Sequence, residues 1–278
     1  MSSSKSISEL QFFTITKTSE IWKSISSAIM TIIDEALFDA TPEGITFRSM
    51  DPSHIALIDI QWPSSAFERY HCSSTIKFGV RIDEFSKMIK RIGTTESIEL
   101  GIQDDSSLYI KTTASEGRYL RNYKTRLIES TGSSSSPLPQ INFDSKIVMG
   151  VVTLDKILND IGIISEKITI DSISSNISNS NKTVVTFSGD SDIGDARVTM
   201  YKNPDKSKDE SIEEIEVRQN SKSTYNIDFI SKIIRAIGHE LSSNLVTIEY
   251  SSNKPVRLEF VLSGVVKIQF YLAPRVQD

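Results

Sequence analysis

The most reactive side chains in this sequence, three histidines and one cysteine, are not spaced for metal binding or nucleophilic catalysis. His54, His71 and His239 have no partner at the spacing that zinc ligands need. His71 and Cys72 are neighbours, but adjacent residues of a strand point to opposite faces of the sheet, so their side chains would not meet. We therefore expect neither a metal centre nor a cysteine nucleophile.

Phosphate-binding and calcium-binding patterns are absent as well. Neither G-x-x-x-x-G-K-[ST] nor G-x-G-x-x-G occurs in the chain. Asp190, Asp192 and Asp195 resemble part of a calcium loop, but the glutamate of its twelfth position is missing, so a tight turn between strands fits better. The sequence predicts no active site, no metal and no cofactor, and therefore a protein that is not an enzyme.

Positive charge, in contrast, recurs on one face of four predicted helices, opposite the apolar stripe of each. Such a face gives affinity for nucleic acid without reading its sequence, because cations that contact phosphates release counterions. No aromatic residues lie among these charges, which disfavours stacking on single-stranded bases. The polar residues opposite the stripes include Lys23, Lys87, Lys90, Arg91, Lys156, Asn159, Lys232 and Arg235.

Two of these helices belong to an internal repeat. Asp83–Gly93 (DEFSKMIKRIG) and Asp228–Gly238 (DFISKIIRAIG) share six of eleven positions at an offset of 145 residues. Each copy is followed by alternating residues, a short polar turn and a second alternating segment, which predicts two strands. The two halves of the chain therefore share one plan.

The remaining predicted elements complete that plan. Ser19–Ile33 and Thr153–Ile161 have apolar residues at helical spacing, and Thr153 is a good N-cap candidate. Together they indicate an α+β chain of four strand–helix–strand units, with the helices on one face of a continuous antiparallel sheet. Segments with period-two alternation are residues 44–47, 55–60, 97–102, 108–112, 184–187, 245–250, 256–262 and 267–272.

Composition sets the broad class. The chain has 278 residues with 31 basic and 36 acidic side chains, a formal charge of −5. No apolar run approaches the ~18 residues of a membrane helix, and no signal peptide is evident, so we expect no membrane association. A single cysteine fits a reducing compartment. We expect an intracellular protein.

Three motifs in order along the chain carry a resemblance to a known family. They are residues 44–58 (GITFRSMDPSHIALI), residues 78–80 with 85–90 (FGV and FSKMIK), and residues 271–275 (YLAPR). They resemble the signatures of the archaeal and eukaryotic sliding clamps, the proliferating cell nuclear antigen (PCNA) family. The similarity runs from about Thr14 to Val276, and MDPSH is more typical of archaeal members.

The resemblance implies the DNA clamp fold and a DNA polymerase sliding clamp, a processivity factor of replication and repair. Three two-domain chains would close into a ring whose helices face a threaded DNA duplex. Association with the chromosome follows, in the cytoplasm or nucleoid of an archaeon or in a eukaryotic nucleus. The implied DNA-facing residues are Lys23, Lys87, Lys90, Arg91, Arg126, Lys156, Lys232 and Arg235.

The resemblance also implies a site for client proteins, namely DNA polymerase, the clamp loader, flap endonuclease and DNA ligase. In the family such clients insert a short hydrophobic anchor helix under the linker between domains. Two members of the implied site, Ile55 and Leu272, have an alternative role in the core. The implied site is Met50, His54, Ile55, Leu138, Pro255, Tyr271, Leu272, Ala273 and Pro274.

The predicted domains are residues 1–128 and 143–278, joined by a Gly/Ser/Pro-rich linker at 129–142. The chain departs from the family in a longer N-terminus, in the serines at 133–136, and in apparently expanded loops at 172–181 and 203–214. The serines put the upper wall of the client site in question.

The expected assembly is a ring of three identical chains, because closing a ring removes exposed sheet edges. The predicted edges are residues 119–127 and 193–201. One subunit of a heterotrimer or of a checkpoint-type clamp is the alternative within the same class. An enzyme on a repeated scaffold lacks an active site here, and an inert scaffold would not explain the basic helix faces.

Overall fold

The computed structural model describes residues 10–104, 106–114, 119–129, 138, 140–175, 182–201, 212–238 and 245–275. The chain forms two compact units. The first consists of Met1–Pro52, Ile58–Ser136 and Leu262–Ile268, and the second of Ser53–Leu57, Pro137–Val261 and Gln269–Asp278. Within the described ranges, no helix is long and apolar enough to cross a membrane.

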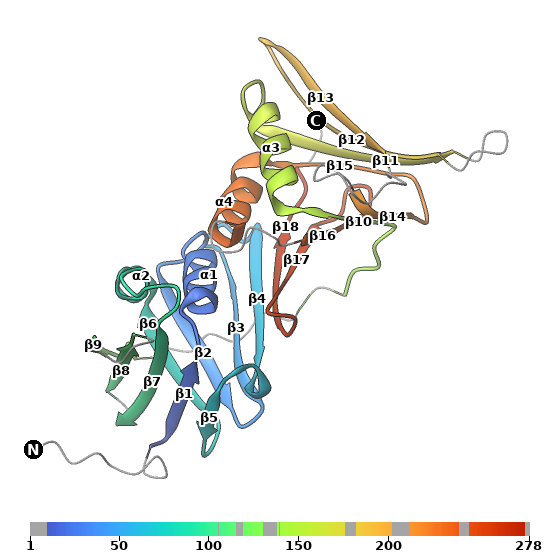
Figure 1. Ribbon diagram of the computed structural model, residues 1–278. Helices are drawn as coiled ribbons and strands as arrows, with labels where there is room; N and C mark the ends of the chain where they lie inside the picture. The colour runs from blue at the N-terminus through green and yellow to red at the C-terminus, as the bar shows by residue number, and fades with distance from the viewer. Residues whose placement is uncertain are drawn as a thin grey trace, which may run out of the picture. The chain divides into compact units, whose positions relative to one another are not determined.

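Among the described residues, the first unit contains the α-helices α1 and α2, the short 3-10 helix Ser64–Ala66 and the strands β1 to β9, apart from the first two residues of β4 (Figure 1). One sheet has the strand order β5-β1-β7-β8-β9. In another sheet, the strands β4, β3, β2 and β6 are hydrogen-bonded neighbours in that order. The elements are β1 Phe12–Thr16, α1 Glu20–Ile29, β2 Glu35–Thr41, β3 Gly44–Met50, β4 Ala56–Pro63, β5 Arg69–Cys72, β6 Ile76–Arg81, α2 Ile82–Lys90, β7 Ser97–Asp104, β8 Ser107–Thr113 and β9 Leu120–Arg126.

The second unit follows the same plan. One sheet has the order β13-β12-β11-β15, and β14-β10-β16-β17-β18 are consecutive neighbours. The elements are β10 Ser145–Gly150, α3 Val151–Gly162, β11 Lys167–Ser175, β12 Lys182–Ser191, β13 Gly194–Tyr201, β14 Ile212–Val217, β15 Ser221–Asn226, α4 Ile227–Gly238, β16 Leu245–Tyr250, β17 Val256–Leu262 and β18 Val266–Leu272, and of these strands Leu262 and residues 266–268 are counted with the first unit.

The internal repeat is confirmed as the two helices α2 and α4. Each follows a strand directly and packs against the other helix of its own unit, α2 on α1 and α4 on α3 (Figure 1). Their apolar stripes are buried, with Phe85 and Ile89 in α2 and Ile230, Ile233 and Ile237 in α4 among the core residues. The α+β fold with four strand–helix–strand units is therefore present in the described residues.

Two helix ends differ from the prediction. Helix α3 begins at Val151, and its N-cap is Gly150 rather than Thr153, whose side chain is buried inside the first turn. Helix α1 ends at Ile29, before the predicted Ile33. Periodicity locates a helical face, but the backbone that leads into and out of a helix decides its ends.

Aromatic packing forms the core around α1 in the first unit. The Trp22 ring lies 4.6 Å from the Trp62 ring and 5.7 Å from the Phe85 ring, between centroids. Trp22 also meets Phe38 at 6.4 Å, so residues of α1, α2, β2 and β4 share one cluster. Aromatic pairs in these geometries add to the stabilisation from buried area.

Candidate functional site

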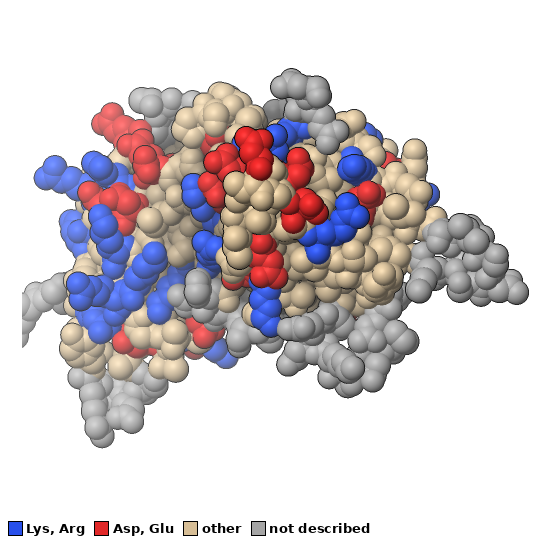
Figure 2. Space-filling model, turned by 90° about the horizontal axis from the view of Figure 1, so that it is seen from above, with Lys and Arg blue, Asp and Glu red and all other residues tan. Residues whose placement is uncertain are grey.

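The first unit presents a cluster of exposed cations on α2 and the neighbouring edge strand β9. Lys87, Lys90 and Arg91 are exposed at the end of α2, and Arg126 is exposed on β9. Lys87 forms an ion pair with Asp83 one turn earlier, at 3.1 Å, but its side chain remains 76% exposed. Figure 2 shows Lys and Arg side chains gathered at the left of the view, where Figure 1 places α2 and β9.

Lys23 was predicted on the same kind of surface, and that expectation is wrong for this chain. Its relative exposure is 7%, and eight of the ten residues of α1 are buried. The residues around it explain why. Ser24 and Ser26 are small, and the Ser26 hydroxyl lies 3.5 Å from that of Ser86 in α2, so the two helices approach closely on the side that was predicted to face solvent.

The second unit presents Lys156, Lys232 and Arg235 as exposed side chains of α3 and α4. Arg235 is engaged by α3, because its guanidinium lies 3.4 Å from Asp155 and donates to Asn159 at 2.5 Å. The Asn159 amide also donates to Asp155 at 3.1 Å. Sequence reasoning placed Arg235 correctly on the surface but missed Asp155, which offsets part of its charge.

The predicted client site falls mostly in the second unit. The backbone N–H of Ala273 donates to the Ile55 carbonyl at 2.8 Å, which joins the segment after β18 to the residues before β4. Ile55 is 38% exposed, and His54 adopts the left-handed backbone conformation with φ of 60°. Pro255, Ala273 and Pro274 are partly exposed. Ile55 and Ala273 are therefore neighbours within the second unit.

The other four predicted members of the site are two buried residues at the end of β18, one residue of the linker and one residue of the first unit. Leu272 is 1% exposed, so its role is in the core, which was the alternative. Tyr271 is 6% exposed and offers little of its ring to a ligand in this conformation. Leu138 is partly exposed, and Met50 ends β3 in the first unit. The serines of the linker at 133–136 lie outside the described residues.

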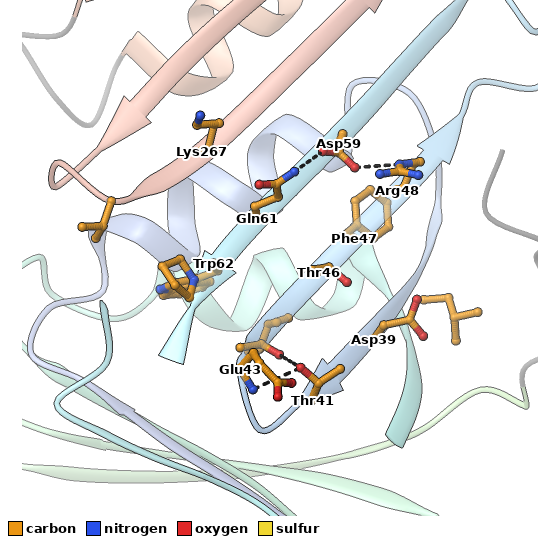
Figure 3. A pocket seen from close by; sticks show the side chains of 15 residues that line it. Asp39, Thr41, Glu43, Thr46, Phe47, Arg48, Asp59, Gln61, Trp62 and Lys267 are labelled. Atoms are coloured by element: carbon orange, nitrogen blue, oxygen red, sulfur yellow. Dashed lines mark hydrogen bonds and ion pairs between the residues drawn. The ribbon is translucent and has the colours of Figure 1, made fainter. Parts of the chain in front are cut away.

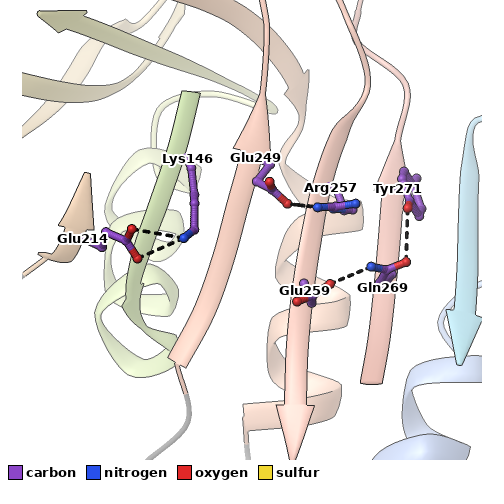
Figure 4. Close-up of polar contacts among 7 residues, drawn as sticks. All are labelled: Lys146, Glu214, Glu249, Arg257, Glu259, Gln269 and Tyr271. Carbon is purple, nitrogen blue, oxygen red and sulfur yellow. Dashed lines mark hydrogen bonds and ion pairs between the residues drawn. The ribbon is translucent and has the colours of Figure 1, made fainter. Parts of the chain in front are cut away.

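A row of polar side chains crosses the sheet beside this segment (Figure 4). Arg257 on β17 pairs with Glu249 on β16, and the Tyr271 hydroxyl donates to the Gln269 side-chain oxygen at 3.2 Å. The Gln269 amide donates to Glu259 at 2.6 Å. No single residue in this row was singled out from the sequence for its polar contacts, because strand alternation identifies a face but not the pairs across it.

A groove of about 400 Å³ lies on the face of β2, β3 and β4 in the first unit (Figure 3). Asp59 lines it with a buried carboxylate, which accepts from Arg48 at 2.7 Å and from Gln61 at 3.2 Å. The carboxylate is thus engaged within the sheet rather than offered to a ligand. No predicted site residue lines this groove.

Two candidates for chemistry that the sequence analysis weighed are Cys72 and the aspartates near the β12–β13 turn. The Cys72 thiol is buried and donates to the Ser74 carbonyl at 3.0 Å, and burial raises its pKa, which disfavours a reactive thiolate. Asp190 and Asp195 face each other at the β12–β13 turn, as predicted for a tight turn. No cluster of metal-ligating side chains occurs within the described ranges, and His239 lies outside them.

The two predicted edge strands are edges of their sheets. β9 is the last strand of β5-β1-β7-β8-β9, and β13 is the last of β13-β12-β11-β15. Tyr119 and Leu120 beside and on β9 are each 54% exposed, and Ile193 and Tyr201 near β13 are 76% and 53% exposed. Exposed apolar residues on an unpaired edge are typical of a surface that adds another strand.

Two α+β units of one plan, each with an edge strand and exposed cationic helices, define a repeated two-domain architecture. Two family models match the chain: the N-terminal domain of proliferating cell nuclear antigen over residues 12–131 and its C-terminal domain over residues 137–275. The chain therefore belongs to the proliferating cell nuclear antigen family, the DNA polymerase sliding clamps.

The relatives agree with this assignment. The DNA polymerase sliding clamp of Cenarchaeum symbiosum is 44% identical over 269 residues, covering 97% of this chain and all of the relative. That of Nitrosopumilus maritimus is 44% identical over 263 residues, with 95% and 98% covered. Both are archaeal, as the MDPSH motif suggested.

Solved structures share the fold. PCNA from A. fulgidus, bound to the C-terminal region of FEN-1, has a TM-score of 0.81 at 24% identity, with 96% of this chain and 99% of that chain covered. PCNA from Thermococcus kodakaraensis has a TM-score of 0.83 at 20% identity, with 95% and 100% covered.

Proposed function

We propose that this chain acts as a non-catalytic clamp, which encloses duplex DNA in a ring of three copies and holds replication enzymes at the DNA. The observation that carries the proposal is the set of exposed cations on the helices of both units, in a chain whose formal charge is −5. Cations concentrated on helix faces favour contact with phosphates, while an acidic remainder disfavours contact elsewhere.

The ring would form by pairing of β9 of one copy with β13 of the next. Both are edge strands, and they have similar lengths of seven and eight residues. An antiparallel or parallel addition at these edges would satisfy backbone groups that the single chain leaves to solvent. A ring that also contains a different chain is the alternative.

Clients would dock a short apolar segment beside Ile55, Pro255 and Ala273. In the A. fulgidus complex, the bound segment is the C-terminal region of FEN-1. We extend that class of ligand, with DNA polymerase, DNA ligase and the clamp loader, to this chain. The partly exposed apolar surface in the second unit supports this extension.

The assembly is tested by light scattering of the purified chain. The expected molar mass is three times the 31.1 kDa of the chain. A monomer at high protein concentration would contradict the ring of identical chains and would favour the heterotrimer.

A further inference from the structure

Strand β15 of the second unit holds the turn between β16 and β17 by two hydrogen bonds. The backbone N–H of Lys222 donates to the Ser252 hydroxyl at 3.1 Å, and the Tyr225 hydroxyl donates to the Lys254 carbonyl at 2.9 Å. Within the turn, the Lys254 N–H donates to the Ser251 carbonyl at 3.2 Å. The turn is therefore fixed both by its own backbone and by β15.

The carbonyl that Tyr225 contacts belongs to the peptide group that leads into Pro255. Proline has no backbone N–H, so this carbonyl is the only group of the Lys254–Pro255 peptide that can form a hydrogen bond. Tyr225 itself is fully buried, with 0% exposure, and a ring held by close packing aims its hydroxyl at one point. The hydroxyl therefore sets the orientation of this peptide plane, and with it the position of the proline ring.

Pro255 lies beside Ala273, at one end of the hairpin that β17 and β18 form. The Gln269 amide on β18 donates to Glu259 on β17 at 2.6 Å, and the two neighbouring strands run in opposite directions (Figure 4). From this contact, the same number of residues leads back along β17 to Pro255 and forward along β18 to Ala273. These two residues therefore come opposite each other, and the hydrogen bond from Ala273 to Ile55 brings the third member of the proposed client site to the same place.

Strand β15 also holds the chain that follows β18. The Arg275 N–H donates to the carbonyl of Thr224, the residue before Tyr225, at 2.8 Å. One strand thus fixes both the turn that carries Pro255 and the segment that carries Ala273. An apolar ligand gains affinity when the surface that it contacts is in place before binding, because less conformational freedom is then lost on association.

We propose that Tyr225 is a positioning residue for client binding, whose buried hydroxyl holds Pro255 in place so that β15 keeps the client site formed before a client arrives. This inference rests on the proposed client site beside Ile55, Pro255 and Ala273. Tyr225 does not touch the client, because its side chain is buried. It acts through the Lys254–Pro255 peptide.

The test is the affinity of a synthetic peptide that copies the C-terminal region of FEN-1, measured by calorimetry on the full chain. Tyr225→Phe removes only the hydroxyl and keeps the buried ring, and we expect about fivefold weaker binding, the size of one lost hydrogen bond. Tyr250→Phe is the matched control. It removes another buried hydroxyl of the second unit, and no hydrogen bond joins that hydroxyl to the turn or to residues 273–275 in the described part of the chain. This control should bind the peptide like the wild type.

A double-mutant cycle separates positioning from a general loss of stability. Pro255→Ala removes the ring that Tyr225 orients, so Tyr225→Phe should weaken binding clearly less in that background than in the wild type. Independent, multiplicative effects of the two changes would refute the coupling through Pro255. Urea unfolding of each variant identifies conditions in which all of them are folded during the titration.

Hydrogen exchange of the wild-type chain tests the proposal without any variant. If β15 keeps the site formed, the backbone N–H groups of Ala273 and Arg275 should already be protected in the peptide-free chain. Fast exchange of both groups that slows only when peptide is bound would overturn the positioning role, because the site would then form on binding.

The outcomes distinguish the two levels of the proposal. Wild-type affinity in Tyr225→Phe, with clear peptide binding by both proteins, would overturn the positioning role and leave the client site intact. An equal loss of affinity in Tyr250→Phe would assign the effect to the core as a whole and would also overturn the positioning role. No binding of the peptide by the wild-type chain would overturn the client site, and the positioning role with it.

Discussion

The pairing of Arg235 predicts that the exposed cations contribute unequally to DNA binding. Lys90 is exposed on the last turn of α2 and has no ion pair among the described residues, whereas Arg235 is tied to Asp155 and Asn159. Lys90→Ala should therefore weaken DNA binding more than Arg235→Ala. Asp155→Asn should strengthen it, because a carboxylate leaves the basic face and Arg235 becomes available to phosphate.

The magnitude follows from counterion release. Each lost phosphate contact makes the negative slope of log affinity against log salt shallower by about 0.9. When salt rises from about 50 to about 200 mM, the affinity of the variant should therefore fall by a factor that is roughly three- to four-fold smaller than the factor for the wild type. We expect that full change for Lys90→Ala and less than half of it for Arg235→Ala. Stability should change by less than about 1 kcal/mol in both, since the side chains are exposed.

The assay is fluorescence anisotropy of a labelled duplex at a series of salt concentrations, with circular dichroism to confirm folding. Lys222→Ala is a suitable control, because Lys222 is exposed on β15 and is not on a helix. Equal slopes for the Lys90 and Arg235 variants, or no gain in Asp155→Asn, would refute the reasoning that the ion pair with Asp155 withholds Arg235 from DNA.

Three further results are expected. Val198→Pro on the edge strand β13 should give monomers by light scattering, because proline removes a backbone donor; a variant that stays trimeric would rule out this edge. Ile55→Ser should weaken peptide binding by ~2 kcal/mol or more by calorimetry, and an unchanged affinity would remove Ile55 from the client site. Glu96→Gln should remove stability above pH 4.5 but not in strong acid, measured by urea unfolding across pH. Burial alone would raise the pKa of Glu96, but Arg121 at 2.6 Å and the Gly93 N–H lower it below its ordinary 4.5. The contribution of Glu96 to the free energy of unfolding is therefore complete above pH 4.5 and is lost as the pH falls through the lower pKa of the folded state. A difference between wild type and variant that does not depend on pH would contradict this.

Much of the fold could be predicted because the apolar spacing is strong. The stripes of α2, α3 and α4 are buried as expected, and β16 and β17 have the predicted bounds. The repeat of α2 in α4 identified the common plan of the halves. In each case, one apolar face fixes both the element and the side that it buries.

The site was less predictable, because spacing within one element does not say what packs on its other face. Lys23 lies opposite an isoleucine stripe, yet α1 is covered on both sides. The small residues Ser24, Ser26 and Ala28 were the available signal, since they allow close helix packing. Asp155 and Tyr225 matter through partners 80 and 29 residues away, and one sequence without relatives does not reveal such pairs.

The central claim, a closed ring around DNA, is tested most directly by retention on circular and linear DNA. The chain is loaded by a clamp loader onto a nicked circular plasmid, and retention is measured before and after a single linearising cut. A closed ring leaves an intact circle only by opening but slides off a free end, so we predict stable retention on the circle and rapid loss after the cut. Equal retention on the two forms would contradict the ring.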